Sequence, residues 1–348
     1  MSILLFEDDE LDIMIDTINM LQMCYHPNYA PNGKFTSRNI FELTSKEITV
    51  ILDKNLVSPI CEIARTGKTK DLLRLQKTAM FVIWLKYINA RVSCGIGLLE
   101  NDTSGLCSVS GEEERKLFLH GMDNIPDVFW KGLAFGYIEC IPPQFTYKAL
   151  AIDEKTYDYT DNFLFLSNEA AMIKIVQLIR TADLSGFNKF LTFLKWYADN
   201  LDVAESVIVY AAMIFSNVPN IAMPKGAKSQ NYDKITYGIK NQAWDLTYIT
   251  TWSMMYSNET DNQCFMFATD DITQKFILAN ILPQGEWINA VASTFKTKTE
   301  HQELEKLLND NFGKNRIRPF INMPDGAKIQ IVRNLICNGY KEIKDTIL

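Results

Sequence analysis

Acidic residues follow two apolar segments of this sequence, and their positions suggest chemistry at a divalent metal ion. Ile48–Leu52 ends at Asp53, and Cys264–Ala268 is soon followed by Asp270 and Asp271. Short apolar runs of this kind are typical of buried strands. The carboxyl ends of parallel strands meet at one edge of a sheet, where ligands bind. We therefore expect these carboxylates to converge.

Two further acids complete the predicted set: Glu100 after Leu98-Leu99, and Asp245 at the predicted start of an apolar helix. Carboxylates that converge repel each other unless a cation lies between them, and Mg²⁺ or Mn²⁺ prefers oxygen ligands. Two such ions can activate water for phosphodiester hydrolysis. A simpler interpretation stays open: an Asp after a strand often only caps the next helix, and Glu100 could be a surface acid.

The elements that must position these acids alternate between strands and helices. Apolar patterning predicts strands at 2–6, 48–52, 91–94 and 264–268. It predicts helices at 11–21, 56–65, 70–90, 112–121, 126–139, 168–182, 185–198, 203–216 and 241–256. This alternation favours an α/β fold with a parallel sheet flanked by helices. We expect four segments, namely an acidic strand–helix segment (1–45), a first core part (46–110), a mainly helical insertion (111–238), and a second core part with C-terminal helices (239–348).

The acidic pattern resembles that of a known family. The apolar strand followed by Asp53-Lys54-Asn55 resembles the opening motif of PIN-domain nucleases, in which the Asp binds metal and the Asn supports the turn. Glu100 and Asp245 are similar to the family's second and third acids. Phe267-Ala268-Thr269-Asp270-Asp271 is similar to its closing signature. The resemblance covers residues 47–105 and 240–280. It implies a PIN-like core in which Asp53, Glu100, Asp245 and Asp271 are catalytic metal ligands, with Asp270 as an additional ligand and Asn55 and Thr269 in support.

This resemblance also implies an activity, that of a Mg²⁺- or Mn²⁺-dependent endonuclease leaving a 5′-phosphate and a 3′-hydroxyl, with RNA favoured over DNA. Candidate contacts to the nucleic-acid backbone are Lys68, Lys70, Lys77 and a basic patch at Lys314, Arg316 and Arg318. The acidic N-terminal segment or the helical insertion could dock a protein partner.

An alternative starts from the N-terminus. Ser2–Glu10, an apolar run ending in four acids, resembles the first strand and acidic pair of response-regulator receiver domains, which hold Mg²⁺. Asp53 then falls at the phospho-acceptor position. A receiver domain would require a strand followed by Lys-Pro near residues 100–110, and the sequence has none there. Under this hypothesis the protein is a non-enzymatic regulatory or interaction protein.

Composition narrows the class. Hydrophobic residues make up 47% and charged residues 22%, which indicates a folded chain. The longest apolar runs are far short of the roughly 20 residues that cross a bilayer, and the start of the chain lacks a basic signal region, so we expect a cytoplasmic protein without a membrane partner. The net charge of -7 gathers in residues 1–45, where seven acids face two basic residues.

The cysteines and histidines argue against other metal chemistry. Seven cysteines include no CxxC pair, and three histidines include no HExxH motif, so any metal is expected to use oxygen ligands. Thr66-Gly67-Lys68-Thr69 imitates the end of a phosphate-binding loop, but Glu62 stands where the earlier glycine belongs. We therefore do not expect a nucleotide site there.

Overall fold

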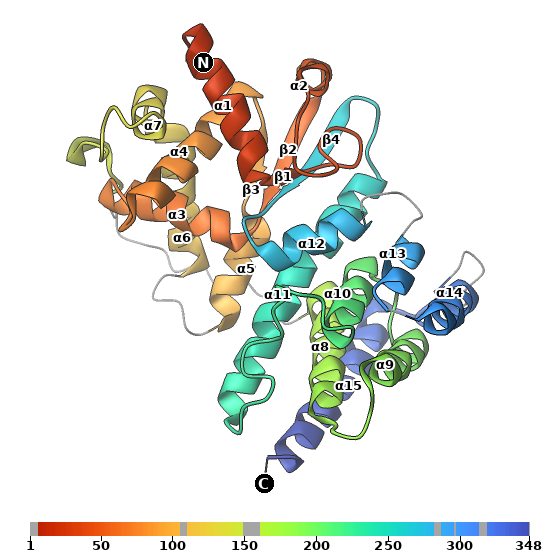
Figure 1. Cartoon of the computed structure of the whole chain (residues 1–348). Helices are drawn as coiled ribbons and strands as arrows, with labels where there is room; N and C mark the ends of the chain where they lie inside the picture. Colours follow the sequence, from red (N-terminus) through yellow and green to blue (C-terminus); the bar gives the residue numbers. More distant parts are fainter. Residues whose placement is uncertain are drawn as a thin grey trace. The chain divides into compact units, whose positions relative to one another are not determined.

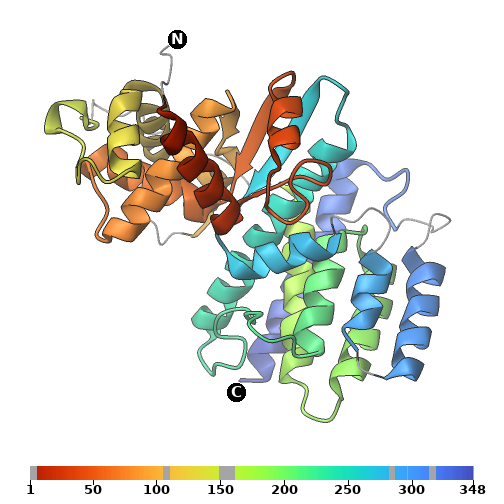
Figure 2. The ribbon, with the colours of Figure 1, turned by 45° about the horizontal axis from the view of Figure 1, so that its top comes forward.

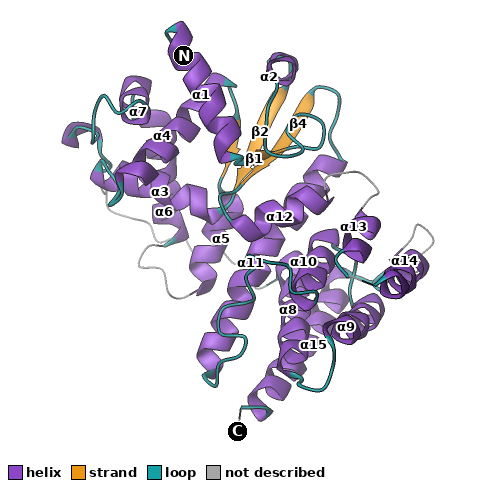
Figure 3. Cartoon of the chain, viewed as in Figure 1, coloured by secondary structure: helices purple, strands orange, loops and turns teal. Residues whose placement is uncertain are grey.

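The chain divides into two compact units. The computed structural model describes residues 6–104, 110–148, 161–281, 287–295, 297–312 and 319–347. The first unit contains Met1–Tyr159 and Trp252–Asp271, and the second contains Thr160–Thr251 and Ile272–Leu348. Each unit is thus built from two stretches of chain that are distant in sequence. Helices predominate in both, as the purple ribbons of Figure 3 show.

A small sheet organises the first unit. Its strands are β1 (Cys24–Tyr25), β2 (Glu47–Leu52), β3 (Arg91–Ser93) and β4 (Gln263–Ala268), in the order β1-β4-β2-β3. β2 runs parallel to both β3 and β4, whereas β1 pairs antiparallel with β4. β2 and β4 lie side by side in Figures 1 and 2, in orange-red and cyan. The sheet is therefore mixed, and its parallel part joins the two distant stretches of chain.

Helices flank this sheet and bury its apolar side chains. They are α1 (Asp8–Leu21), α2 (Ser37–Leu43), α3 (Lys54–Thr66), α4 (Leu72–Tyr87), α5 (Gly95–Ser104), α6 (Gly111–Leu119), α7 (Asp127–Ala134) and the short turns η1 (His120–Asn124) and η2 (Pro143–Phe145). Val50, Leu52 and Met266 are fully buried in the same cluster as Trp84 of α4 and Trp130 of α7. Burial of this apolar surface is the main source of stability for the unit.

Two local features show why these helices begin and end where they do. α1 starts with a capping box, in which the backbone N–H of Glu7 donates to Glu10 Oε2 at 2.8 Å. Glu10 is also ion-paired with Lys131 at 2.6 Å, so this acid of the N-terminal run stabilises the fold. α3 ends at Gly67, whose φ of 79° is left-handed, and a Cβ there would lie 2.6 Å from the carbonyl oxygen of Ile141. Gly67 is thus a helix terminator.

Helices are the only regular secondary structure among the described residues of the second unit. It contains α8 (Phe163–Arg180), α9 (Gly186–Asn200), α10 (Glu205–Phe215), α12 (Ile272–Ile281), α13 (Trp287–Ser293), α14 (Lys298–Phe312) and α15 (Asp325–Asp345), and α11 (Tyr232–Ser257) contributes residues to both units. Ser206 to Phe215 are all buried, so α10 is an internal helix. Gly339 lets α15 approach α8, because a Cβ there would lie 2.4 Å from Ile173 Cγ2.

The sequence predicted much of this architecture. The α/β class, the strands near 48–52, 91–94 and 264–268, and the helices flanking the sheet are confirmed. The expected parallel sheet is present in part, because β2 pairs parallel with β3 and β4 whereas β1 is antiparallel to β4. The predicted strand at 2–6 lies outside the described residues, Phe6 excepted. Among the helices that are described, none combines the length and apolarity that a membrane crossing requires.

Candidate metal centre

The parallel pair β2 and β4 brings Asp53 and Thr269 to one edge of the sheet. Leu52 and Ala268 are register partners at the last position of each strand. The next residues stay together, because the backbone N–H of Asp53 donates to the carbonyl oxygen of Ala268 at 2.9 Å. The predicted convergence at a carboxyl edge is therefore present for the residues that follow these two strands.

Thr269 is the centre of a hydrogen-bond network at this edge. Its hydroxyl donates to Asp53 Oδ2 at 2.8 Å, and it accepts the backbone N–H of Asp271 at 3.0 Å. Asn55 Nδ2 also donates to the hydroxyl oxygen of Thr269, at 3.4 Å. A hydroxyl has one proton and two lone pairs, so all of its capacity is used. Because two donors face its oxygen, the proton of Thr269 is directed at the Asp53 carboxylate.

Asn55 holds the turn after β4 through two hydrogen bonds. Its Oδ1 accepts the backbone N–H of Asp270 at 3.1 Å, while its Nδ2 reaches Thr269. One amide side chain from the first turn of α3 therefore holds two consecutive residues of the distant segment. This bridge fixes the path of the backbone that carries Asp270 and Asp271.

Burial and neighbouring acids shape the electrostatics of Asp53. The residue is 2% exposed, and although it precedes α3 as its N-cap, its side chain makes no capping hydrogen bond. Burial is the largest influence on Asp53 and raises its pKa to about 7. The hydrogen bond from the Thr269 hydroxyl lowers this pKa, and the charges of Glu100 and Asp271, each a smaller influence than that hydrogen bond, raise it. A carboxylate that is buried beside other carboxylates favours a proton or a metal cation.

Glu100 and Asp271 are the two acids whose charge Asp53 senses. Glu100 lies in α5, the helix that follows β3. The side chains of Glu100 and Asp271 are both half-buried. Both acids belong to the first unit and lie close enough to Asp53 for their charges to raise its pKa, one from α5 and the other from the segment after β4.

Asp270 forms an ion pair with a lysine of α4. Lys77 Nζ of α4 lies 2.5 Å from Asp270 Oδ2, and both side chains are about one-third exposed. Of the predicted basic contacts, Lys68 and Lys70 are exposed on the surface. Lys314, Arg316 and Arg318 lie outside the described residues.

Asp245 lies at a different position in its helix from the one that the sequence predicted. It was expected to open a helix, but α11 begins at Tyr232, so Asp245 lies in the helix interior. Its Oδ1 accepts from Gln274 Nε2 at 3.3 Å, and its Oδ2 from Asn241 Nδ2 at 3.5 Å. These residues all belong to the second unit, and the role of Asp245 as a metal ligand stays a prediction.

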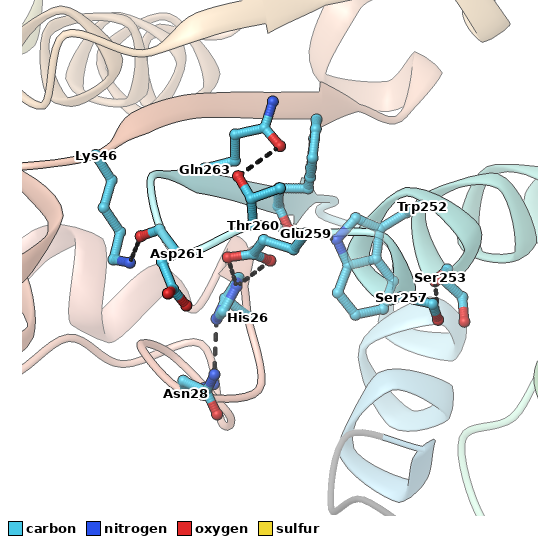
Figure 4. A network of polar contacts seen from close by, with 11 residues as sticks. His26, Asn28, Lys46, Trp252, Ser253, Ser257, Glu259, Thr260, Asp261 and Gln263 are labelled. Carbon is cyan, nitrogen blue, oxygen red and sulfur yellow. Dashed lines mark hydrogen bonds and ion pairs between the residues drawn. The ribbon is translucent and has the colours of Figure 1, made fainter.

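A second polar cluster was missed by the sequence reasoning. His26, Glu259 and Cys264 each offer a ligand atom, and these atoms lie within 4.8 Å of one another. Figure 4 shows His26 held between Glu259 and Asn28. No CxxC or HExxH spacing announces this cluster, because residues 26 and 259 meet only in the folded chain. The expectation that any metal would use oxygen ligands alone did not anticipate it.

No protein-family model, curated protein or solved structure matches the chain.

Proposed function

We propose that the carboxyl edge of β2 and β4 is the centre of a metal-dependent nuclease that hydrolyses phosphodiester bonds, with RNA as the favoured substrate. The single observation that carries the proposal is the Thr269 hydroxyl, which binds the Asp53 carboxylate and the Asp271 backbone at the same time. That bond joins the opening and closing motifs that resemble those of PIN domains.

The donor set fits a hard divalent ion. Asp53, Glu100 and Asp271 offer only oxygen, which is what Mg²⁺ and Mn²⁺ prefer. Asp53 is buried beside two like charges, an arrangement that a bound divalent cation would stabilise. When bound, such an ion supplies Lewis-acid activation of water and neutralises charge on the phosphate.

The residues of the chain itself would position the reaction. Thr269 and Asn55 hold Asp53 and the Asp270–Asp271 backbone in fixed register, which reduces the reorganisation that catalysis would need. Lys77 is a partly exposed cation that lies at this edge through its ion pair with Asp270. A phosphate backbone that approaches the edge could draw Lys77 away from Asp270.

The alternative of a non-enzymatic regulatory protein stays a hypothesis. Residues 2–5 of its receiver-like start lie outside the described residues, and Glu10 from its acidic run is paired with Lys131. That pairing favours a structural role for this acid over a role in holding Mg²⁺.

The test is cleavage of end-labelled RNA and DNA, single- and double-stranded, by the full chain with Mn²⁺, with Mg²⁺ and with chelator. We expect Asp53→Asn to abolish metal-dependent cleavage and to weaken Mn²⁺ binding measured by calorimetry. The matched control is Glu47→Gln, at the opposite end of the same strand, where the side chain is 62% exposed.

Equal cleavage by the wild type and the Asp53→Asn variant, or cleavage that survives the chelator, would overturn the assignment. A folded wild type that neither binds Mn²⁺ nor cuts any of the four substrates would do the same and would favour the regulatory hypothesis.

A further inference from the structure

A cluster of three potential ligands lies at the end of β4 opposite the carboxyl edge. His26 follows β1, Glu259 lies in the turn between α11 and β4, and Cys264 is the second residue of β4. We propose that these three side chains form a second metal site, specific for zinc or a similar transition ion and separate from the carboxylate centre.

The types of donor atom separate this site from the carboxylate centre. An imidazole nitrogen, a carboxylate oxygen and a thiolate sulfur suit Zn²⁺, whereas Mg²⁺ and Mn²⁺ favour oxygen alone. Three protein ligands leave one tetrahedral position for water. His26 and Cys264 are fully buried, while the Glu259 side chain is 13% exposed, so an ion would enter past Glu259.

The metal-free hydrogen bonds define the protons that must move. His26 Nδ1 accepts the backbone N–H of Asn28 at 3.1 Å, so the imidazole proton is on Nε2, which donates to Glu259 Oε2 at 3.0 Å. Binding at Nε2 shifts this proton to Nδ1, and the thiol of Cys264 releases its proton to solvent. The shift costs the hydrogen bond from Asn28, which is small beside the free energy that structural zinc sites release.

One positive charge near the cluster opposes binding of a cation, and two potential negative charges favour it. Lys46 is the neighbouring cation, and its Nζ donates to the carbonyl oxygen of Asp261 and lies 5.6 Å from the ring centroid of Tyr29. The carboxylate of Glu259 and a thiolate at Cys264 together outweigh that single positive charge.

An ion bound at this site would link the two stretches of chain that make up the first unit. Residues 26 and 259 are 233 positions apart, and they belong to the two stretches that make the first unit. An ion shared by them would fasten the segment Trp252–Asp271, which includes β4, to the rest of the unit. Metal bound at one end of β4 would thereby stabilise the strand whose other end leads to Thr269.

Cobalt is the probe, because a thiolate-to-cobalt charge-transfer band reports sulfur ligation directly. The background is the full chain with Asp53→Asn, to remove the carboxylate centre, and with Cys107, Cys140 and Cys337 changed to Ser. We expect one equivalent of Co²⁺ to produce the band and Zn²⁺ to displace it. Zn²⁺ should also raise the melting temperature.

Two variants decide the assignment, and a third is the control. Cys264→Ser should abolish the band, and Cys61→Ser, which alters a buried thiol of α3, should leave it unchanged. Glu259→Gln preserves an acceptor for His26 and should weaken Zn²⁺ binding at least tenfold, even if Cys264→Ser fails to fold. The absence of a band, or Zn²⁺ affinity that is equal in the background and in Glu259→Gln, would show that the cluster is only a hydrogen-bonded clasp.

Discussion

Replacing Thr269 with Val tests how much the carboxyl edge depends on one hydroxyl. The substitution keeps the shape of a fully buried side chain and removes the oxygen that contacts Asp53, Asp271 and Asn55. A hydrogen bond to a charged group is worth about 1.5–3 kcal/mol and a neutral one about 1 kcal/mol. The Asn55 contact, at 3.4 Å, adds little. We expect Thr269→Val to lower the free energy of unfolding by roughly 3 kcal/mol.

The matched variant is Thr269→Ser, which keeps the hydroxyl and loses one buried methyl, at a cost of about 1 kcal/mol. The two variants should therefore differ by roughly 2 kcal/mol in the free energy of opening. Native-state hydrogen exchange at the backbone N–H groups of Asp53 and Thr269 measures this locally, which matters because two units need not unfold together. Both amides donate to backbone carbonyls that the substitution leaves in place.

The pH dependence of Mn²⁺ binding tests the Thr269–Asp53 hydrogen bond independently. The Thr269 hydroxyl lowers the pKa of Asp53, so its removal should raise that pKa further. Mn²⁺ must then displace a proton over a wider pH range, and the pH at which binding is half-maximal should increase in Thr269→Val but stay unchanged in Thr269→Ser. If the two variants have equal exchange rates and equal pH profiles, the hydroxyl does not organise this edge.

Two further perturbations probe charges outside that network. Burial raises the pKa of Glu169, whose Oε1 accepts from the hydroxyl of Tyr340 at 2.7 Å, so its contribution to stability is complete below the unfolded pKa near 4.5 and is lost as pH rises through the folded pKa. Glu169→Gln should therefore be more stable than the wild type at pH 8 and equally stable at pH 4, and a loss of stability in urea denaturation at pH 8 would contradict this. Lys77→Met should release Asp270 and tighten Mn²⁺ binding by at most about fivefold, while KM for RNA rises. Unchanged Mn²⁺ affinity would show that Asp270 does not face the ion.

The sequence was informative about residues that follow strands, because strand ends are local features. Both β2 and β4 are short apolar runs, and their parallel pairing makes Asp53 and Thr269 neighbours without further information. β1 carried no such signal. It is only two residues long, too short for a period, and its antiparallel pairing with β4 depends on tertiary packing around Cys24 and Tyr25.

Asp245 shows where pattern reading loses precision. The helical periodicity was recognised from residue 241, but α11 begins at Tyr232, so an acid expected in the first turn lies well inside the helix. An Asp in a helix interior cannot cap it, and here the carboxylate accepts from Gln274 and Asn241 instead. Helix boundaries are the least predictable feature of a sequence, and the role assigned to Asp245 depended on one.

β4 explains why both clusters were difficult to identify from the sequence. Its last residue leads to Thr269, which binds Asp53 from 216 positions away, and its second residue is Cys264, beside the His26–Glu259 pair. Each cluster therefore exists only after the segment Trp252–Asp271 has joined the earlier part of the first unit. Contacts of such high sequence separation cost loop-closure entropy before they contribute stability. The two clusters should consequently form together, and a variant that detaches β4 should lose both, whereas Thr269→Val and Glu259→Gln each remove only one.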